Sequence, residues 1–329
     1  MFKKFFGFFI LCLGLWLLPG RALAQSESEL NLIFGGDVML GRAVRDQIAK
    51  RGGNDGAWVM QNLAPEFKAA NFAFVNLESP FAPGAALGYS LIFRADPKHV
   101  SALTSAGIDA VSLANNHAKN QGRLGLQTSL SLLTQKGIGV AGAGLTLKSG
   151  YKPAQVQVKK TKVSVLAYTY NEHLPLKNST PTVAGMLTYV MQAEVKKAKA
   201  KGGLVIVSMH AGNEYTLRIT NQQRNFARAA VDAGADLVIG HHPHWVQPIE
   251  IYKTKPIFYS LGNLVFDQPW SLETQLGLVA KVKLVDGQIK QIKLLPIKID
   301  LAAKPRWMNE VEARKVLNRI DRPSGVINF

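Results

Sequence analysis

Three histidines fall within four positions of one short segment. Gly240-His241-His242-Pro243-His244 directly follows an apolar run that ends at Ile239. Packing explains such a cluster poorly, because every imidazole ring brings two nitrogens that need polar partners. Neutral imidazole is the commonest metal ligand in proteins. We therefore predict that this segment binds a metal ion.

Four other polar motifs also follow apolar runs. They contain Asp37 after residues 30–34, Asn76 and Glu78 after residues 72–75, Asn116 and His117 after residues 109–113, and His210 after residues 204–207. In an α/β protein the ligand crevice lies at the carboxyl ends of the strands, so these side chains could meet there. Taken singly, the motifs of Asp37, Glu78 and His210 are explained better by a turn or a local hydrogen bond, and that of Asn116 and His117 equally well by a capped helix start.

Taken together, the motifs offer oxygen and nitrogen donors and no thiolate. The candidate ligands are Asp37, Glu78, Asn116, His210, His242 and His244. Such a set suits Mn, Fe, Zn or Co better than Cu(I) or an iron–sulfur cluster. Two ions sharing a carboxylate could lower the pKa of a bound water and orient an ester. His117 adjoins a candidate ligand without being needed as one, which makes it the expected proton carrier.

Further polar residues are expected around this set. Glu214 and Glu250 are near His210 and His244 in the chain and could orient the histidine rings. Asn76 shares a strand face with Glu78, since side chains two positions apart point the same way.

The elements that must position these residues follow an α/β pattern. Compact apolar runs of strand length occupy residues 30–34, 72–75, 109–113, 163–167, 204–208, 237–239 and 256–259. Helical periodicity covers residues 124–135, 190–201 and 221–233, each followed closely by a glycine. Residues 277–284 and 288–294 flank Asp286-Gly287, which predicts a β-hairpin at the edge of a sheet.

The first 24 residues have the layout of a secretory signal. Lys3 and Lys4 precede an apolar run at residues 5–18, and Ala22-Leu23-Ala24 forms a small-x-small cleavage site. A retained membrane anchor is the alternative, but 14 apolar residues are shorter than the ~20 that span a bilayer. The sequence predicts export to the periplasm or cell surface. The only cysteine, Cys12, would leave with the leader.

Composition sets the class of partner. The 329 residues include 39 Lys and Arg against 22 Asp and Glu, a net charge of +17, and 47% are hydrophobic. Disorder is excluded as the main state, and the charge favours anionic lipids, acidic polymers or phosphates. Because export removes the protein from the genome, no nucleic-acid partner is expected. We predict one large domain at residues 25–302 and a basic helical tail at residues 303–329.

The ordered motifs resemble the CapA-type poly-γ-glutamate capsule biosynthesis proteins, a branch of the calcineurin-like metallophosphoesterase superfamily. The resemblance rests on Gly36-Asp37-Val38-Met39, Asn76-Leu77-Glu78, Asn115-Asn116-His117, His210, Gly240-His241-His242-Pro243-His244 and Tyr259-Ser260-Leu261-Gly262-Asn263. It implies a four-layer α-β-β-α sandwich with a dinuclear site of Mn, Fe or Zn. By the resemblance, Asp37, Glu78, Asn116, His210, His242 and His244 match the metal ligands and His117 the histidine that assists catalysis. His241 and Asn263 are expected beside them.

The chain also departs from the superfamily pattern. Met39 stands where the superfamily has a histidine, and Glu78 where an aspartate is usual. Three hypotheses follow. The protein takes part in synthesis or export of an anionic polymer, together with membrane-associated synthesis machinery; or it is a periplasmic metal-dependent phosphoesterase unrelated to capsule; or it is a non-catalytic module that binds polyanions.

Overall fold

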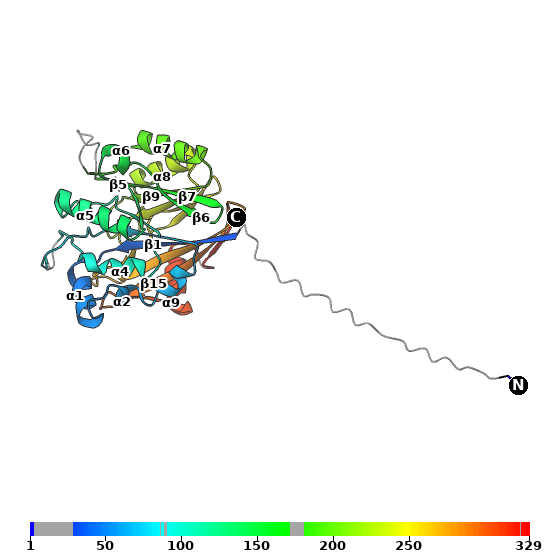
Figure 1. Cartoon of the computed structure of the whole chain (residues 1–329), viewed down its shortest axis with the longest axis horizontal. Coiled ribbons are helices and arrows are strands. Elements are labelled where there is room, and N and C mark those ends of the chain that lie inside the picture. Colours follow the sequence, from blue (N-terminus) through cyan, green and yellow to red (C-terminus); the bar gives the residue numbers. More distant parts are fainter. Residues whose placement is uncertain (3–28, 86, 89–90, 172–180, 323) are drawn as a thin grey trace.

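The computed structural model describes residues 1–2, 29–85, 87–88, 91–171, 181–322 and 324–329. Figure 1 shows the chain with strands of the two large sheets in the middle, α7 and α8 on one side, and α1, α2 and α9 on the other. The expected leader, residues 1–24, lies outside the described residues except for Met1 and Phe2. Among the described residues, no helix combines the length and apolar composition needed to cross a membrane.

The larger sheet is mixed and, within the described residues, has nine strands. Along its main path the order is β16 (Pro305–Trp307), β15 (Gln288–Ile299), β14 (Leu276–Val285), β1 (Glu29–Val38), β2 (Phe72–Leu77), β3 (Ala110–Ser112) and β4 (Gly139–Ala141). β13 (Asn263–Val265) pairs with β1, and β17 (Val326–Asn328) pairs with β15. β1 to β4 run parallel, so their carboxyl ends lie at one edge.

The second sheet has six strands in the described part of the chain. Their order is β11 (Ile249–Tyr252), β12 (Lys255–Phe258), β10 (Leu237–His241), β9 (Leu204–His210), β7 (Thr161–Thr169) and β6 (Ala154–Val158). The four central strands are parallel, and the two outer strands are antiparallel to their neighbours. A separate pair joins β5 (Ala143–Gly144) to β8 (Thr182–Val183).

Alternation along the strands divides the apolar core in two. Val163 and Val165 of β7 belong to a cluster that includes the buried residues of β1, β2 and β3. Leu166 and Tyr168 of the same strand belong to a second cluster with residues of α7 and α8. Because successive side chains of a strand point to opposite faces, the second sheet has one face toward the first sheet and the other toward these helices.

The described residues form nine α-helices and two short 3₁₀ turns, and capping residues mark where α8 begins and ends. The helices are α1 (Arg42–Arg51), α2 (Ala57–Met60), α3 (Ala64–Lys68), α4 (Ser101–Thr104), α5 (Gly122–Gln135), α6 (Leu147–Gly150), α7 (Thr188–Ala200), α8 (Asn221–Ala233) and α9 (Glu310–Arg319), with short 3₁₀ turns η1 (Pro97–Val100) and η2 (Glu273–Gln275). In α8, Thr220 and Gln223 form a reciprocal capping box, and Gly234 ends the helix in the left-handed conformation. The predicted α/β class and the three predicted helices are confirmed.

The predicted β-hairpin is confirmed, but its predicted position at the edge of the sheet is wrong. β14 and β15 pair across Asp286-Gly287 as expected. They do not lie at the sheet edge, because β14 also pairs with β1 and β15 also pairs with β16 and β17. The basic segment 303–329 supplies those two outer strands along with α9, so it packs onto the sheet. Apolar side chains of the segment, such as Leu317 and Ile320, join the main core.

Candidate metal centre

The two sheets bring their candidate ligands to the ends of adjacent strands. In the larger sheet Asp37 of β1 is in register with Asn76 of β2 and with Asn263 of β13. In the second sheet His241 of β10 is in register with His210 of β9. Within each sheet these strands are parallel, so their carboxyl ends share an edge. Contacts of Asp37 with His241 and His244 bring the two edges together, as the sequence analysis expected.

Asp37 accepts contacts from both sheets. Its Oδ1 receives a hydrogen bond from Nδ2 of Asn76 at 2.9 Å and lies 3.2 Å from Nδ1 of His241. Its Oδ2 lies 3.4 Å from Nδ1 of His244 and accepts the backbone N–H of His242 at 3.3 Å. Burial by itself would raise the pKa of Asp37, but the hydrogen bonds and charges of His241 and His244 hold that pKa well below its ordinary value. Asp37 is therefore an anion in this site.

Glu78 lies at the centre of the cluster. Its Oε1 is 3.8 Å from Nε2 of His210 and 3.9 Å from Nε2 of both His244 and His117. Both carboxyl oxygens are buried, and no described residue gives them a hydrogen bond. Burial, reinforced by the negative charge of Asp37, raises the pKa of Glu78 well above its ordinary value. Burying a carboxyl group without a polar partner costs free energy, and a bound cation would offset that cost for Glu78.

His210 connects two amide side chains. Its Nε2 lies 2.8 Å from Oδ1 of Asn116, and its Nδ1 lies 3.3 Å from Nδ2 of Asn76. Burial and the nearby ring of His242 lower the pKa of His210 well below its usual value. Burial, with the charge of His244, also lowers the pKa of His242 to about 3. Both rings are neutral near pH 7 and can act as metal ligands without losing a proton.

The histidine segment holds an uncommon backbone conformation. His242 has φ 99° and His244 has φ 56°, which place both residues in the left-handed region that L-residues rarely adopt. The residue before the histidines must be glycine, since a Cβ on Gly240 would lie 2.0 Å from the carbonyl oxygen of Tyr259. Backbone strain of this kind is typical of functional sites, where the surrounding structure enforces it. All three imidazoles of this segment reach the cluster, His241 and His244 beside Asp37 and His242 with its ring centroid 4.8 Å from that of His210.

The side chains form two overlapping groups, each of which could hold a metal ion. Ligand atoms of Glu78, His210 and His242 lie within 4.8 Å of one another, and so do those of Asp37, Glu78 and His244. Glu78 belongs to both groups. Its two oxygens and Nδ1 of His242 are buried and receive no hydrogen bond from the described residues, which is the condition of ligands that a metal would satisfy.

His117 stands beside this set in a different environment. Its Nδ1 lies 2.8 Å from Oδ1 of Asn120, and its ring stacks on Phe93 with 3.8 Å between centroids. Burial lowers the pKa of His117 to about 4, so the ring is neutral at pH 7. Its Nε2 faces Glu78 at 3.9 Å, where a neutral imidazole can accept or return a proton.

Met39 fills the position where the resemblance expects a histidine. The residue is fully buried, and its Sδ accepts the backbone N–H of Gly41 at 3.0 Å. The group around Asp37 therefore has three candidate ligands, whereas Asn116 next to His210 gives the other group a fourth.

The remaining expected residues separate into those that join the cluster and those that do not. Oδ1 of Asn263 lies 2.9 Å from Nδ1 of His244, so Asn263 can orient that imidazole ring. Glu214 is exposed at the rim, and its charge acts on Glu78 and His244. Glu250 instead binds Arg228 and the hydroxyl of Tyr259, and the described residues give it no contact with a histidine of the site.

Sequence reasoning missed a buried ion pair near the cluster. Arg42 pairs with Asp267, which also accepts the backbone N–H of Ala43 at 2.9 Å. The guanidinium lies over the rings of Phe93 and Phe266, at 4.7 and 5.7 Å from their centroids. The position of Arg42 directly after the Asp37 motif could have pointed to this residue. Its charge alone, however, did not distinguish Arg42 from solvent-exposed arginines.

Comparison with known proteins places the chain in a family. The family model described as bacterial capsule synthesis protein PGA_cap matches residues 31–268. This range contains every candidate ligand and the strands that carry them, and it ends before β14 and β15 of the larger sheet. The chain belongs to this family of bacterial capsule synthesis proteins.

The similar proteins found by sequence comparison include capsule and polyglutamine synthesis proteins. The chain is 32% identical over 265 residues to the PGA biosynthesis protein CapA of Bacillus subtilis, covering 79% of this chain and 69% of the relative. It is 29% identical to the capsule biosynthesis protein CapA of Bacillus anthracis, covering 95% and 79%. A probable polyglutamine synthesis accessory protein of Mycobacterium tuberculosis is 25% identical, covering 92% and 94%. The crystal structure of TT1561 of Thermus thermophilus aligns with a TM-score of 0.43 and 12% identity over 85% of this chain and 98% of that one.

Proposed function

We propose that this chain is an exported protein of poly-γ-glutamate capsule synthesis that carries a two-metal centre. Membership of the capsule synthesis family and the names of the two CapA relatives support a role in synthesis of this polymer. The sequence layout of residues 1–24 supports export, followed by leader cleavage or retention as an anchor. A positively charged chain suits a polyanionic product and the membrane-associated machinery that would make it.

The ligand sets proposed for the two ions share one carboxylate. Glu78, Asn116, His210 and His242 would hold one ion, and Asp37, Glu78 and His244 the other. The observation that carries this proposal concerns Glu78. Its buried oxygens find no hydrogen-bond partner in the described part of the chain, while three imidazole nitrogens lie within 4 Å of Oε1. Mn, Fe or Zn suits such mixed oxygen and nitrogen ligands.

The side chains around the centre have separate tasks. When bound, two such ions supply Lewis acidity and a lowered pKa for water. His117 holds or releases a proton at Nε2, on the side that faces Glu78, while Asn120 fixes its Nδ1. Asn76 orients Asp37 and His210, and Asn263 orients His244. The class of reaction that these groups serve is ester or polymer hydrolysis, with a phosphoester or the anionic polymer as substrate.

The fold proposed for this function is the four-layer α-β-β-α sandwich. The split of β7 between two apolar clusters supports it. We propose that residues 25–302 form the functional domain, with residues 303–329 as its C-terminal extension.

Metal analysis tests the centre directly. Protein loaded with Mn or Zn and freed of excess metal is expected to hold two ions per chain, and Glu78→Gln less than one. Glu250→Gln is the matched control, because that carboxylate binds Arg228 and Tyr259 instead. Equal metal content in the wild type and Glu78→Gln would refute the shared ligand.

Catalysis needs its own test. His117→Ala is expected to abolish turnover of a generic aryl phosphoester while leaving the metal content unchanged. Wild-type protein that binds two ions and hydrolyses no ester would argue for a polymer-binding role of the centre. Equal turnover in both proteins would remove His117 from the reaction.

A further inference from the structure

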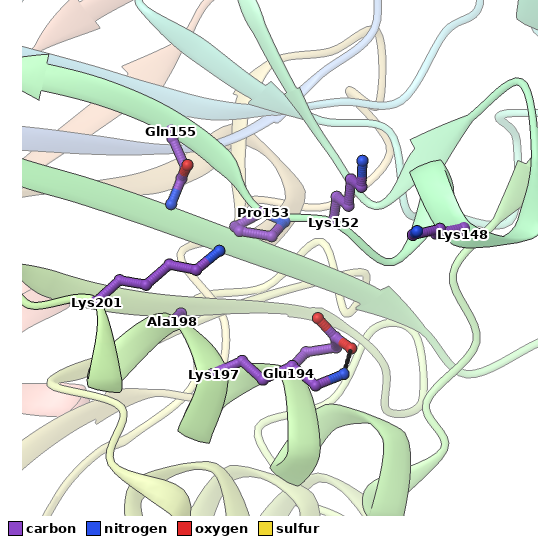
Figure 2. A pocket seen from close by; sticks show the side chains of 8 residues that line it. All are labelled: Lys148, Lys152, Pro153, Gln155, Glu194, Lys197, Ala198 and Lys201. Atoms are coloured by element: carbon purple, nitrogen blue, oxygen red, sulfur yellow. Dashed lines mark hydrogen bonds and ion pairs between the residues drawn. The ribbon is translucent and has the colours of Figure 1, made fainter.

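A basic groove lies apart from the metal cluster. Figure 2 shows it between α7 and the chain that leads from α6 into β6. It encloses about 420 Å³, and its lining includes Lys148, Lys152, Lys197 and Lys201. None of these residues belongs to the candidate metal centre. The groove therefore needs an explanation of its own.

The charge of the groove is largely uncompensated within the described residues. Lys197 pairs with Glu194 at 2.6 Å. For Lys148, Lys152 and Lys201 the described part of the chain supplies no hydrogen bond or ion pair, and all three are exposed. Three such ammonium groups beside one hollow attract an anion with several charges more strongly than a singly charged one.

The lysines line the groove from two sides, Lys148 and Lys152 from the α6–β6 segment and Lys197 and Lys201 from α7 and its C-terminal end. Lys201 and Lys148 stand at opposite ends of the view in Figure 2, with Pro153 and Ala198 between them. Pro153 and Ala198 give the hollow an apolar part, against which methylene groups can pack. A ligand that fits must be extended, with carboxylates or other anions repeated along an aliphatic backbone.

The two walls of the groove match the geometry of one such polymer. A γ-linked glutamate unit has five backbone bonds against three in an α-peptide, which makes its extended repeat about 6 Å and adds methylene groups to the backbone. Each unit carries one free carboxylate, and because five is an odd number, successive carboxylates point to opposite sides of an extended chain. Lys148 and Lys152 on one wall and Lys201 on the other can therefore meet carboxylates on both sides.

We propose that this lysine groove binds an extended segment of γ-linked polyglutamate, as an anchoring site separate from the metal centre. The proposal rests on the proposed function, which supplies the polymer. It adds where the chain would be held and why a γ-linked backbone is preferred over an α-linked one.

The test compares two variants that remove the same charge. Lys148→Gln, Lys152→Gln and Lys201→Gln are combined in a groove variant. The control variant combines Lys50→Gln, Lys136→Gln and Lys315→Gln, three exposed lysines outside the groove. Fluorescence anisotropy measures the binding of a labelled γ-linked glutamate decamer in low salt, with an α-linked decamer and anionic phosphatidylglycerol vesicles as further arms.

The groove variant is expected to bind the γ-linked decamer about tenfold more weakly than the control variant, because three exposed charge contacts are lost. The wild type should prefer the γ-linked decamer, and the groove variant should lose this preference. Added salt should weaken wild-type binding, since exposed charge pairs are screened over ~10 Å at 0.1 M.

Three results would overturn the proposal. Equal decamer binding by the groove and control variants would remove the groove alone and leave the proposed function standing. Loss of vesicle binding with unchanged decamer binding would assign the groove to a membrane surface. A wild type with two bound ions that binds neither decamer would remove the polymer from the proposed function as well.

Discussion

Glu78→Gln should make the metal-free protein more stable and, at the same time, insensitive to metal. The carboxyl group of Glu78 is buried, neither of its oxygens has a hydrogen-bond partner among the described residues, and its pKa is raised well above 4.5. An acid whose pKa is raised by folding favours the folded state below its unfolded pKa. That contribution is lost as pH rises through the folded pKa. Glutamine has nearly the same shape and never ionises.

The size of the effect follows from proton linkage. Between the unfolded and the folded pKa, the unfolded state loses the Glu78 proton while the folded state keeps it, which lowers the unfolding free energy by about 1.4 kcal/mol per pH unit. The stability gained by Glu78→Gln should therefore grow at this rate as pH rises above 4.5, until the folded pKa is reached. The neutral histidines also titrate across this range. Their contribution is largely common to both proteins, so the difference between the proteins is the diagnostic quantity.

Urea unfolding of chelator-treated protein at several pH values measures this difference. Glu310→Gln, at an exposed glutamate of α9, controls for the loss of one surface carboxylate. Added Mn or Zn should then stabilise the wild type and leave Glu78→Gln unchanged, because a ligand stabilises only the state that binds it. Parallel pH profiles for the wild type and Glu78→Gln would refute the account of Glu78 as a buried, uncompensated carboxyl.

Three further outcomes are expected. Gly36→Ala should lower the unfolding free energy by about 1–3 kcal/mol or more and reduce metal content, because its Cβ would lie 1.9 Å from the carbonyl oxygen of Gly262, next to Asp37; an unchanged urea transition would contradict this. Thr220→Ala should cost about 1 kcal/mol by removing the cap of α8, and Thr220→Ser should restore it. Metal binding at pH 7 should release a proton, measurable by calorimetry in buffers of different ionisation enthalpy. Burial alone would lower the pKa of His244, but the charges of Glu78 and Asp37 raise it to about 9, so a ring that ligates metal must lose that proton. Metal affinity should rise between pH 7 and pH 9, and a flat profile would exclude His244 as a ligand.

The strands and helices were largely readable in the sequence. Residues 30–34, 72–75 and 204–208 are apolar runs with no helical period, and they form the centres of β1, β2 and β9. The helix over residues 221–233 is marked at both ends, by Thr220 and by Gly234. The hairpin at residues 277–294 was also readable, but its neighbours were not, because pairing with β1 depends on contacts more than 200 residues away.

The residues of the candidate site also divide into those that the sequence indicated and those that only the structure revealed. Position after a strand selected Asp37, Glu78 and His210 correctly as members of one cluster, since parallel strands end at a common edge. Proximity in sequence failed for Glu250, whose strand β11 lies at the outer edge of its sheet and turns the carboxylate toward Arg228. Arg42 escaped notice because only its burial against Phe93 and Asp267 sets it apart.

By itself the sequence determined which side chains can bind metal, the strand ends that carry them and the family to which the chain belongs. These are local properties, written in residue type and in spacing of a few positions. The tertiary structure decided which carboxylate is left without a partner, which histidines stay neutral and which lysines surround a groove. Those properties depend on burial and on distances between segments far apart in the chain, and they come into being only when the two sheets pack together.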